Sequence, residues 1–166
     1  MSPLSSRDRI LNKICDNRED LLLRLERERQ GKKVVFTNGC FDLLHSGHVL
    51  YLAAARELGD ILVIGVNDDD SVRRLNKGPN RPLNPLRDRM TVLAALADVS
   101  YVFPFSEDTP ESSIRVLRPD VHAKGGDYLE DELPEKDAVI EGGGRIAIIP
   151  FVSGYSTTSI LKRALD

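Results

Sequence analysis

Two of the three histidines in the chain stand three residues apart, on either side of a glycine, in the sequence His45-Ser46-Gly47-His48. The segment follows a short apolar run and precedes a stretch with helical spacing, so it is expected at a helix N-terminus. A helix N-terminus presents N–H groups and partial positive charge, which favour phosphate. Gly47 lets a ligand approach the backbone, and both imidazoles can donate hydrogen bonds or charge to phosphoryl oxygens. From these residues alone, a capped helix whose histidines have no chemical role stays an open alternative.

A strongly basic segment lies downstream, between Ser71 and Arg89. Against the single acid Asp88 it contains six basic residues, an excess of +5: Arg73, Arg74, Lys77, Arg81, Arg87 and Arg89. Arg73 and Arg74 are expected on a solvated face, as is usual for a run of charges. Lys77 and Arg81 stand in a loop shaped by glycine and proline, as in a flexible lid, and are predicted to bind phosphate. Arg89 is expected at a helix start, where a phosphate contact and a structural salt bridge fit equally well.

Two further segments combine glycine or hydroxyl groups with polar side chains. In Lys124-Gly125-Gly126 the glycines permit close backbone approach, and Lys124 can meet a phosphate. Asp127, the next residue, can accept hydrogen bonds from sugar hydroxyls. The alternative is a glycine-rich turn with an ordinary surface lysine. Residues 156–159 place several hydroxyls at the start of the last predicted helix, where one would suffice as a cap, so a second phosphate site is predicted there.

The elements between these segments must position them. Short apolar, β-branched runs predict strands over residues 34–37, 61–66, 101–103, 121–123 and 145–149. Helices are predicted over 49–58, up to about 75, over 87–97, from about 109 and over 156–165. The alternation indicates an α/β fold, a Rossmann-like doubly wound parallel sheet of about five strands. Ligands of such sheets bind at the carboxyl ends of the strands, which is where most of the residues above are expected.

The first thirty residues predict helices of their own. Ile10, Leu11, Ile14 and Cys15 form one apolar stripe at helical spacing, and a second amphipathic run extends over residues 18–30. We therefore predict an N-terminal helical extension over residues 1–31 and one α/β domain over residues 32–166. The second helix is expected to pack on the domain or on a partner chain.

The composition excludes several classes of protein. The chain has 166 residues, of which 41% are hydrophobic and 30% charged, so it can form a core without disulfides or metals. Its net charge of −3 argues against a general nucleic-acid binder. No apolar run is long enough to span a membrane and no signal-peptide core is present, so a cytoplasmic location is expected. The two cysteines, Cys15 and Cys40, lack metal-ligand spacing.

Four ordered segments together resemble the nucleotidyltransferase superfamily marked by an HxGH motif. The likeness runs through residues 34–48, 76–82, 124–128 and 155–159 and covers the chain from about residue 33 to the C-terminus. Within this superfamily the chain most resembles the adenylyltransferases that make ADP-heptose from heptose 1-phosphate. The related cytidylyltransferases usually carry an arginine shortly before the final Ser-Thr motif, whereas residues 151–154 here are Phe-Val-Ser-Gly. This departure disfavours a CTP-dependent glycerol-phosphate enzyme.

The resemblance implies attack of a sugar phosphate oxygen on the α-phosphorus of ATP, with Mg²⁺ bound largely by the triphosphate and water rather than by the protein. It assigns catalytic roles to His45, His48, Lys77 and Lys124. It assigns contacts with the nucleotide and its phosphates to Thr37, Asn38, Gly39, Phe41, Gly47, Arg81, Arg89, Ser156, Thr157 and Thr158. It assigns sugar-phosphate contacts to Asp42, Lys124, Gly125, Gly126 and Asp127, although Asp42 can equally order its own loop.

Two alternatives stay open beside this reading. One is a cytidylyltransferase or FMN adenylyltransferase that uses another phosphorylated acceptor; the other is a nucleotide-binding protein without turnover. The expected partners are ATP and a sugar phosphate, with no nucleic acid and no membrane, and the superfamily likeness implies a homodimer. A sugar kinase, if one is needed, is expected on a separate chain.

Overall fold

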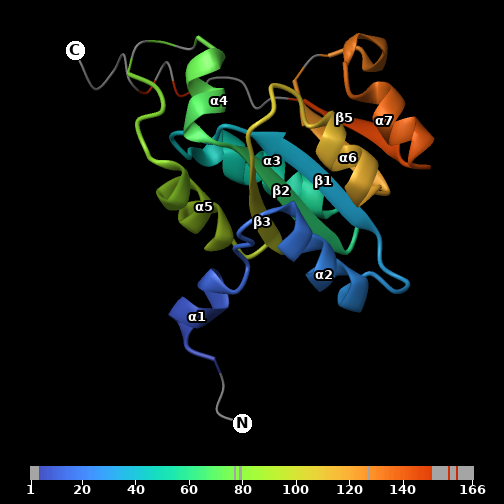
Figure 1. The fold of residues 1–166 in the computed structure, drawn as a ribbon, viewed down its shortest axis with the longest axis horizontal. Helices are drawn as coiled ribbons and strands as arrows, with labels where there is room; N and C mark the ends of the chain where they lie inside the picture. The colour runs from blue at the N-terminus through green and yellow to red at the C-terminus, as the bar shows by residue number, and fades with distance from the viewer. Residues whose placement is uncertain are drawn as a thin grey trace.

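The computed structural model describes residues 4–76, 78, 80–126, 128–150, 157 and 160. Five strands form one sheet: β1 (Val34–Gly39), β2 (Ile61–Asn67), β3 (Tyr101–Phe105), β4 (Val121–Gly125) and β5 (Arg145–Ile149). Their spatial order is β3-β2-β1-β4-β5, and every pairing is parallel (Figure 1). The predicted Rossmann-like α/β fold is therefore confirmed. The strand order reverses direction between β1 and β4, which makes this junction the topological switch point.

Helices separate the strands, as the alternating pattern predicts. They are α1 (Ser6–Leu11), α2 (Arg18–Glu28), α3 (Ser46–Arg56), α4 (Asp69–Arg74), α5 (Leu86–Ala94), α6 (Glu111–Leu117) and α7 (Lys136–Glu141), with a short 3₁₀ turn at Glu130–Glu132. Side chains of Ser5, Asn17 and Asp68 accept backbone N–H groups at the starts of α1, α2 and α4. The predicted closing helix over residues 156–165 lies outside the described residues, apart from two helical positions at 157 and 160.

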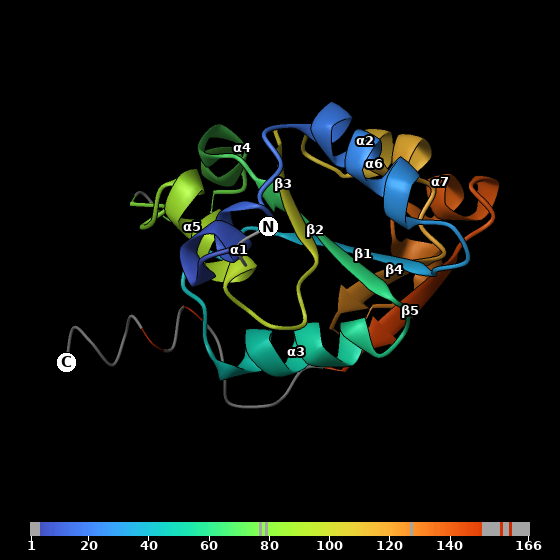
Figure 2. The ribbon, with the colours of Figure 1, turned by 90° about the horizontal axis from the view of Figure 1, so that it is seen from below.

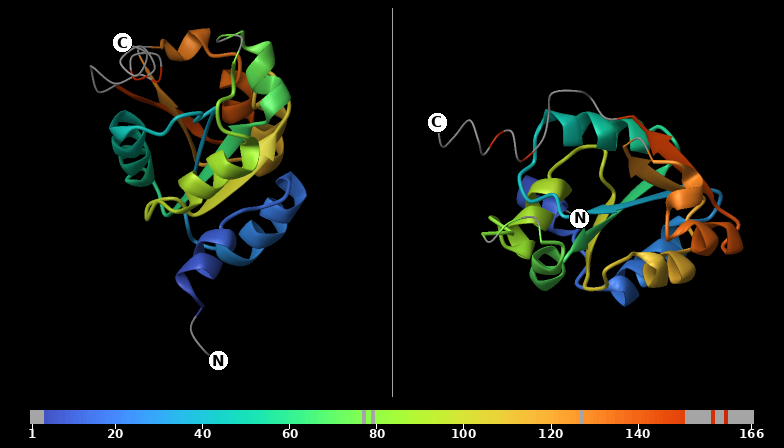
Figure 3. Two further views of the ribbon diagram at one scale, coloured as in Figure 1. Left: turned by 90° about the vertical axis from the view of Figure 1, so that its left-hand side faces the viewer. Right: turned by 90° about the horizontal axis from the view of Figure 1, so that it is seen from above.

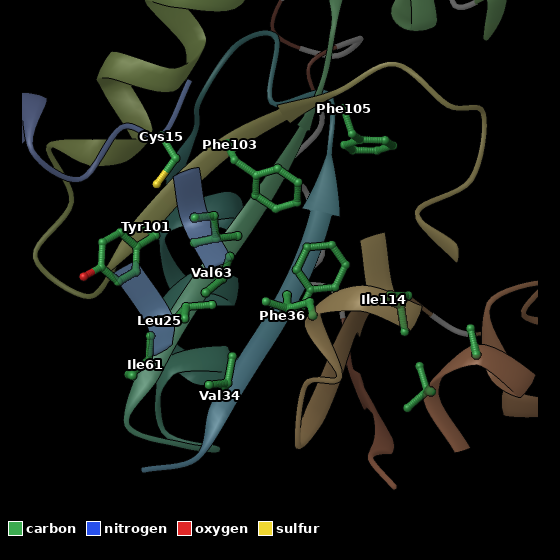
Figure 4. Close-up of a cluster of buried hydrophobic side chains, with 14 of the residues drawn as sticks. Cys15, Leu25, Val34, Phe36, Ile61, Val63, Tyr101, Phe103, Phe105 and Ile114 are labelled. Atoms are coloured by element: carbon green, nitrogen blue, oxygen red, sulfur yellow. The ribbon is translucent and has the colours of Figure 1, made fainter. Parts of the chain in front are cut away.

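The helices cover both faces of the sheet. Figure 2 shows α2, α6 and α7 on one face and α3 on the other, where α5 also packs. On the first face Phe36 and Phe103 pack with Leu25 of α2 and Ile114 of α6 (Figure 4). On the second face Leu52 of α3 packs in a cluster with aliphatic side chains of β1 and β2. Burial of each such side chain contributes about 1.5–3 kcal/mol, so the two clusters fix α3 and α7 against the strands that they flank.

The segment between α1 and α2 covers the edge of the sheet at β3. Cys15 N–H donates to Val102 O at 2.8 Å, and Val102 N–H donates to Lys13 O at 2.9 Å, so that Ile14 pairs with β3 in parallel. The prediction of one helical stripe over residues 10–15 is therefore wrong beyond Leu11, where α1 ends. After a final turn, the Lys13 carbonyl and the Cys15 N–H make hydrogen bonds to an edge strand instead of continuing the helix.

The second predicted N-terminal helix packs on the domain. Leu21 and Leu25 of α2, together with Cys15, are buried in the same cluster as the strand residues of β1 and β3. Figure 3 shows α1 below α2; α1 contacts α5, and its Ile10 packs against the cluster on the other face of the sheet. The apolar face of α2 is therefore occupied by the core of this chain, and the predicted N-terminal extension contributes Cys15, Leu21 and Leu25 to that core.

Candidate active site

The His45-Ser46-Gly47-His48 segment forms the N-terminus of α3, as the sequence predicts. His45 is the N-cap: its Nδ1 accepts the backbone N–H of His48 at 3.4 Å. The helix therefore begins at Ser46, three residues before the predicted start at 49, because an imidazole takes the capping role that a hydroxyl usually has. The two imidazole rings stack with centroids 3.8 Å apart. No acidic residue lies in the first turn of α3, so the positive end of its dipole is available to an anion.

The state and orientation of the histidines follow from their surroundings. Burial lowers the pKa of His45 below its usual value, so the ring is neutral at neutral pH. Because Nδ1 accepts a hydrogen bond, the proton of the neutral ring lies on Nε2. The Phe41 ring meets the His48 ring edge-on with centroids 5.3 Å apart, and the Phe41 backbone is left-handed, with φ of 46°. A Cβ at position 39 would lie 3.1 Å from the Phe41 ring, so Gly39 leaves room for this ring.

A tyrosine bridges the switch point between β1 and β4. These strands pair only at Val35–Val121 and Phe36–His122 and then separate. Beyond that point the Tyr51 hydroxyl of α3 donates to Ala123 O at 3.0 Å and shares a 2.7 Å hydrogen bond with Thr37 Oγ1. Burial raises the pKa of Tyr51 to about 12, so the hydroxyl keeps its proton.

Thr37, predicted to contact the nucleotide, is fully buried in this arrangement. Its hydroxyl ties β1 to α3. Sequence reasoning missed Tyr51, although its place three residues after His48 on a helix was a usable signal.

The carboxylate of Asp42, just before His45, binds the end of the basic loop, which is the loop between α4 and α5. Its Oδ2 accepts from Arg81 Nη1 at 2.5 Å, and its Oδ1 accepts the backbone N–H groups of Leu83 and Asn84 at 2.7 and 3.0 Å. Asn84 Nδ2 also donates to Asp42 O at 2.6 Å. These hydrogen bonds hold the pKa of Asp42 below its usual value although burial opposes them. Two roles are predicted for Asp42, a contact with the sugar phosphate and the ordering of a loop. Its hydrogen bonds in the structure are those of a residue that orders a loop.

Arg89 occupies the centre of a second network. It is 2% exposed. Its Nη1 donates to Cys40 O and Asn67 O at 2.7 and 2.8 Å, and its Nε donates to Asn84 O at 3.0 Å. Its Nη2 pairs with an Asp69 carboxylate oxygen at 2.7 Å. Arg89 thereby joins the ends of β1 and β2, the basic loop and α4. The sequence allows Arg89 either a phosphate contact or a structural salt bridge, and the contacts in the structure are those of a structural salt bridge.

Lys124 lies at the end of β4 on the face that α7 covers. Its Nζ donates to Glu135 Oε1, and the same oxygen makes a 3.1 Å hydrogen bond with His122 Nε2. Glu135 and His122 are buried, whereas the Lys124 side chain keeps 21% of its surface exposed. Burial would raise the pKa of Glu135, but the hydrogen bonds from His122 and Lys124 outweigh it and lower that pKa to about 2. Gly126, with φ of 136°, then turns the chain and donates its N–H to Ile149 O at 3.0 Å.

The structure offsets much of the positive charge that the sequence places in the basic segment. Every partner is a carboxylate, and all four come from outside the segment: Arg73–Asp70, Arg74–Asp108, Arg81–Asp42 and Arg89–Asp69. Arg73 and Arg74 are exposed, as predicted. The positive electrostatic potential that a phosphate would meet at this segment is therefore weaker than the local excess of +5 indicates.

The remaining predicted residues lie partly within the described chain. Asn38 is half-buried at the end of β1, and its buried Oδ1 has no hydrogen-bond partner among the described residues. Thr157 Oγ1 donates to Leu43 O at 3.5 Å, which places Thr157 beside the residues that precede His45. Gly47 lies in the first turn of α3, and Gly125 ends β4. Four predicted residues lie outside the described ones: Lys77, Asp127, Ser156 and Thr158.

Within the described part of the chain, no group of three or more His, Cys, Asp and Glu side chains could hold a metal ion. In the same part, no helix is long and apolar enough to cross a membrane.

A helix N-terminus with two histidines, set at the switch point of a five-stranded parallel sheet, is the arrangement of a nucleotidyltransferase-like fold. A family model described as cytidylyltransferase-like matches residues 36–163. The chain belongs to this family. Its similarity to individual proteins narrows the comparison further.

Over 145 residues, 87% of this chain, it is 56% identical to the bifunctional protein HldE of Syntrophotalea carbinolica. Over 133 residues, 80% of this chain, it is 55% identical to the protein of the same name from Alkalilimnicola ehrlichii. These matches cover 29% and 28% of the two relatives, so the chain spans less than a third of their length.

Two solved structures are also similar. The lipopolysaccharide core biosynthesis protein from Thermoplasma volcanium superposes with a TM-score of 0.62 and 28% identity, covering 76% of this chain and 100% of that one. Pantoate-beta-alanine ligase from Francisella tularensis, complexed with beta-gamma ATP and beta-alanine, gives a TM-score of 0.54 at 16% identity, covering 89% of this chain and 75% of that one. The second likeness shows the fold alone.

Proposed function

We propose that this domain transfers AMP from ATP to heptose 1-phosphate and releases ADP-heptose and pyrophosphate. The observation that carries the chemistry is the N-terminus of α3, where two stacked histidines and a first turn without carboxylates stand at the switch point of the sheet. The choice of acceptor is supported by the four ordered motifs and by 56% identity to a bifunctional HldE protein over most of the chain.

The proposed reaction needs no strong general base. The second pKa of a phosphate monoester is about 6, so the attacking oxygen of the sugar phosphate is largely ionised at neutral pH. That oxygen forms a bond to the α-phosphorus of ATP while the bond between the α-phosphorus and the bridging oxygen of the β-phosphate breaks. Both electrons of the broken bond leave with pyrophosphate. The work of the protein is therefore to align two polyanions and to stabilise the charge that develops on the leaving group.

The residues at α3 fit that work. The neutral His45 ring carries its proton on Nε2 and can donate it as a hydrogen bond to a phosphoryl oxygen, while its Nδ1 keeps the helix capped. His48, held by stacking against His45 and by the edge of Phe41, offers a second donor. The dipole of an eleven-residue helix favours the same negative charge. Bound Mg²⁺ would neutralise charge on the triphosphate, and since the described side chains form no metal-binding group, phosphates and water would supply most of its ligands.

Pyrophosphate release tests the proposal. The purified protein is assayed with each of the four nucleoside triphosphates against a panel of phosphorylated acceptors that includes heptose 1-phosphate, glycerol 3-phosphate and FMN. We expect ATP with heptose 1-phosphate to give the highest kcat/KM. Preference for CTP or for another acceptor overturns the substrate assignment, and binding of nucleotide without turnover on any acceptor leaves a nucleotide-binding protein.

A substitution at α3 tests the role of the histidines. His48→Ala should reduce kcat at least about 100-fold, as expected when one transition-state donor is lost. Leu50→Ala is the matched control, because Leu50 is an exposed residue of the same helix and should leave kcat unchanged. Turnover of His48→Ala close to that of the control, with folding intact, removes His48 from the proposed chemistry.

The proposal includes a cytoplasmic homodimer. Light scattering on the purified chain gives its mass in solution, and a mass of 18.5 kDa at working concentration excludes the dimer.

A further inference from the structure

Beneath the carboxyl end of β4, the buried carboxylate of Glu135 receives two hydrogen bonds on one oxygen, from His122 and from Lys124. Glu135 is 1% exposed and lies at the start of α7, eleven residues after Lys124. We infer that Glu135 is a positioning residue that holds the Lys124 ammonium at the end of β4, where it meets the sugar phosphate. This inference rests on the function proposed above.

The first step of the argument concerns the charge on Glu135. A buried carboxylate requires a charged or hydrogen-bonding partner, because desolvation disfavours the ionised form. His122 cannot supply a charge: it is buried, and burial lowers its pKa below the usual value, so the ring is neutral at neutral pH. Lys124 is the cation that the described residues place against Glu135. A movement of Lys124 away from β4 would leave the carboxylate buried without a counter-charge.

The second step concerns what Lys124 can still do while it is paired. An ammonium has three N–H donors, and one is engaged by Glu135. Part of the side chain is exposed, beside the Gly125-Gly126 turn where the backbone can be approached closely. Glu135 thus turns a long flexible side chain into a fixed donor. A fixed donor loses less conformational entropy when a ligand binds than a mobile lysine would.

The third step concerns which substrate Lys124 faces. His122 stacks on Phe36 in the cluster under α6 and α7, whereas Ala123 belongs to the cluster under α3. Lys124 follows the alternation of the strand and lies on the side of His122, across the sheet from α3. In-line displacement needs the nucleophile and the leaving group on opposite sides of the α-phosphorus. With the leaving pyrophosphate at α3, the opposite position of Lys124 matches the attacking sugar phosphate.

Steady-state kinetics of three variants of the full chain test the inference. Glu135→Gln keeps the shape of the side chain and removes its charge. The double variant Glu135→Gln with Lys124→Met removes both charges together, so no buried ion is left alone. Lys136→Gln is the matched control: it neutralises a nearby lysine whose partner, Asp131, is exposed. We expect KM for heptose 1-phosphate to rise at least tenfold in the first two variants, with KM for ATP changed less than twofold and with the control unchanged.

The double variant separates positioning from packing. If the pair serves stability alone, the double variant refolds with wild-type KM values for both substrates, and the inference is overturned. An equal rise in KM for ATP and for the sugar phosphate in Glu135→Gln also overturns it, since the effect would then not be confined to the acceptor.

A spectroscopic measurement tests the same inference without turnover. An ammonium held by a buried carboxylate exchanges its protons slowly enough to be seen in proton–nitrogen NMR spectra, and the Lys124 signal is assigned by its absence in the single variant Lys124→Met. We expect the signal in the wild type and its loss in Glu135→Gln. A signal that persists in Glu135→Gln shows that Glu135 does not hold Lys124. If the wild type releases no pyrophosphate on any acceptor, the proposed function fails, while this signal still decides whether Glu135 fixes the lysine.

Discussion

Tyr51→Phe removes one oxygen atom from the junction of β1, β4 and α3. That hydroxyl donates to Ala123 O at 3.0 Å and shares a 2.7 Å hydrogen bond with Thr37, whose side chain is fully buried. The variant leaves a buried hydroxyl and a carbonyl without a partner, and each such group costs about 1–3 kcal/mol. We therefore expect the free energy of unfolding to fall by about 2–4 kcal/mol, measured by urea denaturation with an unchanged m-value.

The companion variant Thr37→Val shows whether the two hydroxyls act together. Thr37→Val removes one of the two groups that Tyr51→Phe leaves without a partner, so the double variant should be less destabilised than the sum of the single variants, by about 1 kcal/mol. Strict additivity, or a loss below about 0.5 kcal/mol in Tyr51→Phe, refutes the reasoning from this hydrogen-bond pair. A rise of KM for ATP in Thr37→Val that its stability does not explain supports the nucleotide contact that the sequence predicts for Thr37.

Three other substitutions probe the networks that hold the loops at the carboxyl edge. Arg89→Met should lower the free energy of unfolding by about 3–5 kcal/mol in urea, because it leaves buried carbonyls and a carboxylate without their common donor. Asp42→Ala should speed hydrogen exchange at the backbone amides of Leu83 and Asn84 at least tenfold, since both amides lose their acceptor. Glu135→Gln should make the free energy of unfolding less dependent on pH between pH 4.5 and pH 2. The pKa of Glu135 in the folded protein is about 2, below the usual 4.5, so the carboxylate stabilises the fold by about 3 kcal/mol above pH 4.5. This contribution is lost as the pH falls toward 2.

Each of these predictions has an internal control. Arg73→Met removes an exposed arginine and should leave the free energy of unfolding in urea within about 0.5 kcal/mol of the wild type. The Ser71 amide, which donates to Asp68, should exchange at its wild-type rate in Asp42→Ala. Acid curves of wild type and Glu135→Gln that run parallel between pH 4.5 and pH 2 contradict the assignment to Glu135.

The sheet and the α3 site are predictable from sequence because their signals are local. β1 and β2 open with continuous apolar runs, and the two histidines stand at the start of the helix that His45 caps. Tyr51 is harder to predict, since its two partners come from strands 14 and 72 residues away. The extended pairing of Ile14 with Val102 is harder still, because its apolar neighbours have helical spacing and only tertiary contact decides.

The charge balance of the site could not be predicted from local composition. Counting residues 71–89 gives +5, but the carboxylates that pair with Arg81 and Arg89 come from residues 42 and 69, outside that window. Glu135 stands in an acidic stretch that reads as exposed surface, yet it is among the most buried side chains of the chain. The composition of a segment gives its charges, but the ion pairs that these charges form depend on the fold.

The extended segment that pairs with β3 bears on self-association. An uncovered edge strand is a template onto which strands of other molecules can add. Here residues 13–15 occupy that edge at Val102, beside a strand composed of Tyr-Val-Phe-Pro-Phe. The family match begins at residue 36, so a fragment cut to it would expose this aromatic edge along with the surface under α2. The N-terminal segment thus covers part of the edge strand to which strands of other molecules could otherwise add.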